Sequence, residues 1–159
     1  MIERRETDEE ISVCVLVLCI VATTAVFAAP PSKGIGVGIS AGLPFHAAVT
    51  AEYNFGPAYA TLSLGYIGSF WVRAEGGYNL PTPFINDDLG IDLFLSVGGT
   101  FDMMFSESGT TVGIGIPVTW SYTLEKVPMK FFVKAGPQLF FGGGLAFMGT
   151  IGGMYVFKL

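Results

Sequence analysis

Few residues of this chain have side chains and spacing suited to catalysis, and the first to consider is its single histidine, His46. A serine nucleophile needs a base beside it and an acid that orients the base. Ser69 falls in a neighbouring connection, but no acid accompanies it there. His46 is therefore expected to be a hydrogen-bonded filler. No spacing of histidines or acids suggests a metal site. The sequence predicts no enzyme, no catalytic residue, no metal and no cofactor.

The remaining candidates are acids and bases that recur at even spacings inside apolar segments. They are Glu52, Arg73, Glu75, Asp92, Asp102, Lys130 and Lys134. Residues separated by an even number of positions lie on one face of a β-strand. An unpaired charge in a confined interior is costly. We therefore predict a lumen charge network, which could either form a salt-bridged plug or line a narrow channel.

The elements that must position these charges are eight predicted β-strands. Bulky apolar residues alternate with small or polar residues, which is the pattern of a strand with two different faces. The predicted strands are 35–43, 45–55, 58–66, 70–80, 89–105, 112–124, 127–141 and 145–159. Turn residues separate them, and the longest connection is Pro81–Asp88. The sequence therefore predicts an all-β fold, an eight-stranded antiparallel up-and-down barrel with short loops.

Composition indicates which face of the barrel lies outside. The chain is 51% hydrophobic and 13% charged, against about 25% charged in soluble domains. Bulky apolar residues line one face of all eight strands, which is more than a small inner core could hold. The other face carries glycine, serine, threonine and balanced charges. We therefore predict that the apolar face contacts lipid and that each strand crosses the bilayer. A soluble exported barrel is the alternative.

Aromatic residues support this orientation because they gather at both ends of the apolar faces. One rim is predicted to hold Phe45, Tyr66, Phe70, Phe105 and Phe141. The other is predicted to hold Tyr53, Phe55, Tyr78, Trp120, Tyr122, Tyr155 and Phe157. Such girdles are typical of barrels that span a bilayer.

The segment before the barrel is predicted to be an export signal. Ile11–Phe27 is an apolar run followed by Ala28, Ala29 and two prolines. Small residues before Ala29 suit a signal peptidase, so we expect residues 1–28 to be removed and 29–159 to form the barrel. A retained membrane anchor is the alternative. Both cysteines lie in this segment, so the predicted mature chain has neither a disulfide nor a thiolate metal site.

The closing strand carries alternating aromatic residues, Tyr155 and Phe157, before the final Leu159. With the signal segment and eight alternating strands, residues 33–159 resemble the small eight-stranded outer-membrane barrels of bacteria, the OmpX, OmpA and OmpW type. The resemblance implies an outer-membrane location, contact with outer-membrane lipid, help from the barrel-insertion machinery and a periplasmic N-terminus. The net charge of −5 gives no reason to expect a nucleic-acid partner.

Three functions remain open at this point. The first is a narrow, porin-like channel or transporter for small apolar molecules, which the OmpW resemblance implies. Pro117 and Pro137 fall within adjacent strands, where each removes a ladder hydrogen bond. They mark either a weak point in the wall that lets a ligand leave sideways or a local bend.

The second function is a structural, anchoring barrel with a salt-bridged, plugged interior. The third, less favoured, is a lipid-modifying enzyme of the outer membrane.

Overall fold

The computed structural model describes residues 33–43, 46–66, 68–86, 91–107, 109–124 and 127–159. The side chains at 46, 81–86, 91 and 92 are outside this description, as is the predicted signal segment 1–28. Among the described residues, no helix is long and apolar enough to cross a membrane.

The described chain forms nine strand segments in one sheet. They are β1 (Gly34–Leu43), β2 (His46–Asn54), β3 (Ala58–Tyr66), β4 (Phe70–Asn86), β5 (Ile91–Ser106), β6 (Gly109–Gly115), β7 (Val118–Thr123), β8 (Met129–Phe140) and β9 (Gly144–Lys158). Glycines with positive φ stand in the turns, for example Gly142 and Gly144 between β8 and β9. Glycine adopts this backbone conformation without a steric penalty, which permits tight connections.

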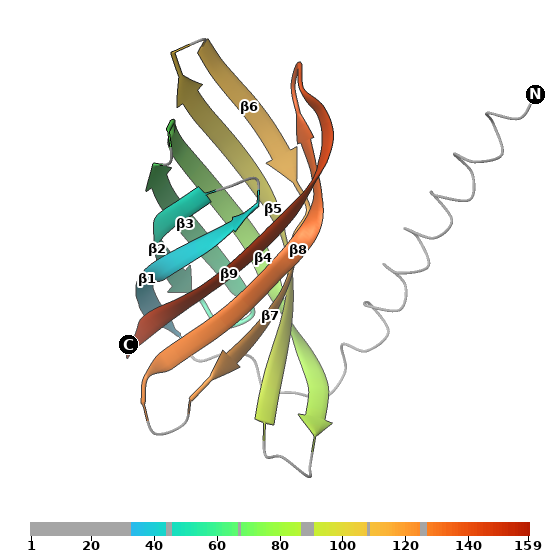
Figure 1. The fold of residues 1–159 in the computed structure, drawn as a ribbon. Helices are drawn as coiled ribbons and strands as arrows, with labels where there is room; N and C mark the ends of the chain where they lie inside the picture. The colour runs from blue at the N-terminus through green and yellow to red at the C-terminus, as the bar shows by residue number, and fades with distance from the viewer. Residues whose placement is uncertain (1–32, 44–45, 67, 87–90, 108, 125–126) are drawn as a thin grey trace, which may run out of the picture.

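The sheet closes on itself as a barrel, because the first strand pairs with the last. Ile35 of β1 lies opposite Phe157 of β9, and every pairing in the sheet is antiparallel. β6 and β7 follow one another between the same neighbours, β5 and β8, so they form one wall position. Figure 1 shows β1 and β9 side by side at this closure. The predicted eight-stranded antiparallel barrel is confirmed.

The strands are strongly staggered around the barrel. Strand partners followed once around from Gly34 of β1, keeping the register of β6 and β7 across the interruption at Pro117, lead to Met148 of β9. Met148 is next to Gly149, the partner of Leu43. One circuit therefore advances about ten residues along β1, a shear at which eight strands tilt by roughly 35–45°. A barrel of this size encloses a lumen that side chains can just fill.

Two local predictions differ from the structure. β4 continues to Asn86, so the predicted connection Pro81–Asp88 is wrong over its first six residues. Pairing with β5 shifts between Leu80 and Phe84, and the two prolines in this interval cannot donate ladder hydrogen bonds. The single strand predicted at 112–124 is interrupted at Ile116 and Pro117, for the same reason.

The barrel is polar inside and apolar outside. Large apolar side chains on the outer wall are strongly exposed, for example 71% at Ile39 and 63% at Ile151, whereas Asp102 inside is 1% exposed. Among the side chains that the structure describes, six charged ones are buried in the lumen: Glu52, Arg73, Glu75, Asp102, Lys130 and Lys134. Water-soluble proteins show the opposite distribution.

Candidate functional site

The charged residues of the lumen form three ion pairs. Arg73 Nε lies 2.6 Å from Asp102 Oδ1, and these residues are ladder partners on β4 and β5. Lys130 of β8 contacts Glu52 of β2 at 2.6 Å, and Lys134 of β8 contacts Glu75 of β4 at 2.7 Å. Neither of these two pairs joins neighbouring strands. Both pairs therefore cross the lumen.

Two of the carboxylates have a second hydrogen-bond donor. The Tyr59 hydroxyl donates to Glu75 Oε1 at 2.7 Å, and Gln138 Nε2 donates to Asp102 Oδ2 at 2.8 Å. A buried ion pair needs such additional hydrogen bonds because its lone pairs have lost water. We call Tyr59, Gln138 and the six paired charged residues the lumen cluster.

Aromatic rings pack against two of the cations. The Arg73 guanidinium lies 4.6 Å from the ring centroid of Trp71, and Lys134 Nζ lies 5.2 Å from that of Phe132. Both aromatic side chains are buried. Rings at these distances attract a cation through their quadrupole and also fill volume. They therefore help to close the lumen around the charges.

Two glycines give Tyr59 the room to reach Glu75. Gly77 and Gly98 are ladder partners on β4 and β5. A Cβ atom added to Gly77 would lie 2.6 Å from the Tyr59 hydroxyl oxygen, and one added to Gly98 would lie 2.7 Å from it. The Tyr59 ring therefore lies across the bare backbone of these two strands.

A second group of buried polar side chains lies near the β2–β3 turn. Asn79 Nδ2 donates to the Gly56 carbonyl oxygen at 2.8 Å, and Ser96 Oγ donates to Asn79 Oδ1 at 2.8 Å. Asn54 Oδ1 accepts a bond from the Gly56 amide at 2.8 Å. These contacts hold the turn over the wall formed by β4 and β5.

A small void lies beside the lumen cluster. A void of about 10 Å³ lies beside Arg73, Lys134 and Thr150, room for roughly one water molecule. Ser40, Thr50 and Ser63 line it and share hydrogen bonds of 3.0 Å. Arg73 Nη2 and Thr150 Oγ1 have no hydrogen-bond partner within the described part of the chain. The polar lining and these two atoms suit a bound water better than an empty cavity.

Six of the seven charges selected from the sequence thus lie together in the lumen. The side chain of the seventh, Asp92, is outside the described part of the structure. Sequence reasoning missed Tyr59 and Gln138. Both occupy inward positions of the alternating pattern, so a search of the inward face for polar side chains of any kind would have found them.

The wall at Pro117 and Pro137 has lost hydrogen bonds but stays paired. Gly98 N donates to Pro117 O at 3.0 Å, and Ile116 N donates to Pro137 O at 3.1 Å. The reciprocal hydrogen bonds, from residue 117 to the Gly98 carbonyl and from residue 137 to the Ile116 carbonyl, are absent because proline has no N–H. The Ile116 carbonyl lies against the bare Cα of Gly136, where a side chain would collide with it. Pro117 itself is fully buried. The ladder is therefore locally distorted at these two prolines.

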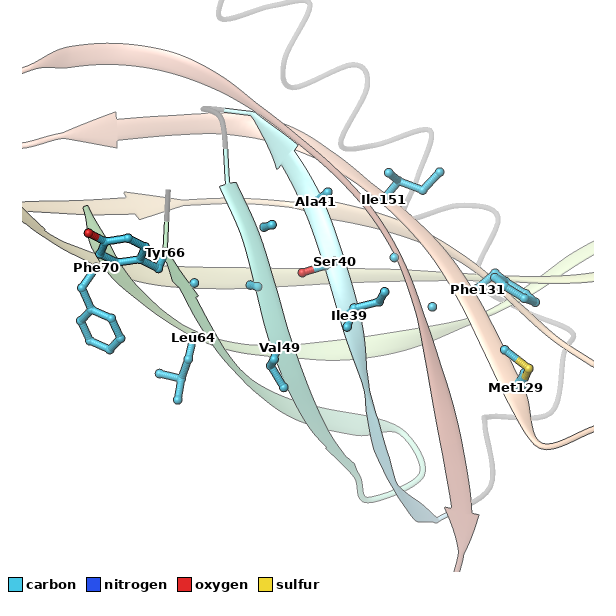
Figure 2. Close-up of a pocket in the computed structure, with 15 residues that line it drawn as sticks. Ile39, Ser40, Ala41, Val49, Leu64, Tyr66, Phe70, Met129, Phe131 and Ile151 are labelled. Atoms are coloured by element: carbon cyan, nitrogen blue, oxygen red, sulfur yellow. The ribbon is translucent and has the colours of Figure 1, made fainter. Parts of the chain in front are cut away.

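A long apolar groove marks the outer wall (Figure 2). It has a volume of about 880 Å³ and crosses β3, β2, β1, β9 and β8. Tyr66 and Phe70 stand at one end, and Met129 and Phe131 stand at the other. We call it the outer groove.

The other sequence candidates can be placed only in part. His46 begins β2, but its side chain is outside the described residues. No group of three histidine, cysteine or acidic side chains able to hold a metal occurs in the described ranges. Comparisons with protein-family models, curated proteins and solved structures gave no match to this chain.

Proposed function

We propose that this protein is an integral β-barrel of the bacterial outer membrane with a closed lumen, acting as a membrane anchor or scaffold. The observation that carries the proposal is the reversed polarity of the barrel. Large apolar side chains cover its outside, and its buried charges are paired inside. In water such an exterior would drive aggregation, whereas in a bilayer it is matched to the acyl chains.

Aromatic pairs at the ends of the strands support a bilayer location. The rings of Tyr53 and Phe55 lie 4.5 Å apart, and those of Tyr155 and Phe157 lie 4.8 Å apart. At the opposite end of the barrel the rings of Phe70 and Phe105 lie 6.0 Å apart. Aromatic belts of this kind fit the two interfaces of a membrane. They also fit the resemblance to small outer-membrane barrels and insertion by the same machinery.

The lumen cluster favours an anchor over a channel. Two ion pairs cross the lumen, and the void beside them holds about one water. To admit a small apolar molecule, the protein would have to separate buried charges, which costs about 3–5 kcal/mol for each broken pair. The two hydrogen bonds kept by the wall at Pro117 and Pro137 argue against a side exit for such a ligand there.

The membrane location is tested with the outward Leu62, which is 48% exposed on β3. Leu62→Arg is expected to lower the yield of barrel folded into lipid vesicles, because an arginine on the lipid face costs about 2–4 kcal/mol near the midplane. Heat-dependent migration on gels measures the folded fraction. In a soluble barrel the same change would be harmless, and wild-type protein that stays monodisperse without detergent would contradict the proposal.

The closed lumen is tested by conductance in planar bilayers. The wild type is expected to be silent, whereas Glu75→Ser with Lys134→Ser removes a cross-lumen pair and is expected to give small, steady openings. The matched control is Ala74→Ser on the outer face of β4, which should stay silent. Steady wild-type openings as large as those of the double variant would favour the channel.

A further inference from the structure

The floor of the outer groove is partly main chain, left bare between the exposed side chains of Ile39, Val49 and Ile151. Ala41 and Ala47 are ladder partners at its centre, and Gly153 of β9 lies beside Ile39. Ser40 and Gly152 also line the groove, although their side-chain positions face inward. Small outward residues on three adjacent strands therefore leave the backbone uncovered.

Large side chains form the two ends of the groove. Tyr66 and Phe70 flank the β3–β4 turn, at one rim of the barrel. Met129 begins β8, at the opposite rim. A Cβ atom placed on Gly153 would lie 3.3 Å from the Phe131 ring, so this ring forms a wall beside the floor. Figure 2 shows the two groups of side chains separated by β1, β2 and β9. The groove thus extends from rim to rim.

The shape of the groove decides among three occupants. A second barrel is convex, so it would touch the rims of the groove and could not bury there the ~800 Å² per partner that a stable interface needs. A helix with its side chains is about 10–12 Å wide, too broad to reach the main chain at Ala41 and Ala47 between the exposed Ile39 and Val49. A single hydrocarbon chain is thin, flexible and wholly apolar. The groove is also continuous with the apolar outer wall that the proposed function places in lipid.

We infer that the outer groove is a binding site for one acyl chain of a bilayer lipid, held more firmly than the lipid around the rest of the barrel. The inference rests on the proposed membrane location. The chain lies over Ala41, Ala47 and Gly153, and the Phe131 ring packs against its side. Tyr66, 70% exposed, presents its hydroxyl at the rim, where tyrosines meet lipid headgroups.

The test is native mass spectrometry of the full chain released from nanodiscs of phosphatidylethanolamine and phosphatidylglycerol. The wild type is expected to retain one lipid under activation that strips the others. Ala47→Leu fills the floor of the groove and is expected to lower retention about tenfold. Ala74→Leu makes the same change on the outer face of β4, outside the groove, and is expected to retain lipid like the wild type. If Ala47→Leu fails to fold, Tyr66→Ala removes one end of the groove instead.

Each outcome is decisive. A wild type that inserts into nanodiscs but retains no lipid overturns the inference and leaves the proposed function standing. Equal retention by Ala47→Leu and Ala74→Leu also overturns it, as does a retained mass equal to a second copy of the chain. Retention only after removal of residues 1–28 would assign the groove to the segment Ile11–Phe27. A protein that does not insert refutes the proposed function itself.

Discussion

The inner faces of β1 and β8 line one lumen but are built from opposite kinds of residue. The inward residues of β1 are Gly34, Gly36, Gly38, Ser40 and Gly42. Those of β8 are Lys130, Phe132, Lys134, Gly136, Gln138 and Phe140. The small face lies at the closing seam, and the large face sends two lysines across the lumen.

This difference shows how a narrow barrel is filled. An eight-stranded barrel has room for only one layer of large side chains, so the large side chains on β8 require glycines on a facing strand such as β1. At the seam, β9 lies so close to β1 that a Cβ on Gly38 would collide with the Gly153 carbonyl and lie 2.5 Å from Met154 Cα. The Met154 sulfur likewise occupies the position of a Gly36 side chain, at 2.5 Å. The glycines and the charges are therefore two parts of one packing solution.

The largest effect is expected at the seam. Gly38→Ala should prevent barrel closure, because the obstacle is backbone that cannot rotate away, and we expect a cost above about 3 kcal/mol. Heat-dependent gel migration should show loss of the compact form. Gly99→Ala is the matched control, since an outward Cβ there meets nothing within 4 Å. Equal folding of the two variants would disprove the steric role of the seam.

The next effect is expected in the lumen cluster. Glu75→Gln leaves Lys134 without its counter-charge and should destabilise the barrel by about 3–5 kcal/mol. Urea unfolding in vesicles measures the change. Adding Lys134→Met removes the stranded charge, so the double variant should be more stable than the single one. If it is no more stable, the pair does not behave as a buried ion pair.

A smaller effect is expected at Tyr59. Tyr59→Phe removes the hydroxyl that donates to Glu75 while keeping the ring, and should cost about 1.5–3 kcal/mol. Tyr53→Phe, on the outer wall, is the control and should stay within about 0.5 kcal/mol. Both are compared by the urea midpoint. Similar midpoints would mean that the hydrogen bond from the Tyr59 hydroxyl does not contribute to the stability of the barrel.

The smallest effect is expected at the distorted wall. Pro137→Val restores an N–H opposite the Ile116 carbonyl but gives up the stiffness of proline in the unfolded chain. These contributions oppose one another, so unfolding free energy should change by less than about 1 kcal/mol. Conductance should stay absent. Uptake of an apolar dye by the wild type that Pro137→Val abolishes would restore the side-exit hypothesis.

Much of the architecture could be predicted because strands have a side-chain period of two. Alternation located the eight strands and placed Arg73 and Glu75 on the same face. It could not locate the end of β4, where the prolines at 81 and 83 resemble a turn but lie in an irregular stretch of strand. Nor could it pair Lys134 with Glu75, which are 59 residues apart in the chain.

The sequence by itself determined which residues face in and which face out, since that choice follows from position along each strand. The tertiary structure decided which inward residues meet. The stagger of about ten residues per circuit sets the height of every side chain in the lumen. It brings Lys130 to Glu52 and Lys134 to Glu75 across the barrel. It also gathers Ala41, Ala47 and Gly153 into one groove on the outside. Register is a property of the closed sheet, and no single strand encodes it.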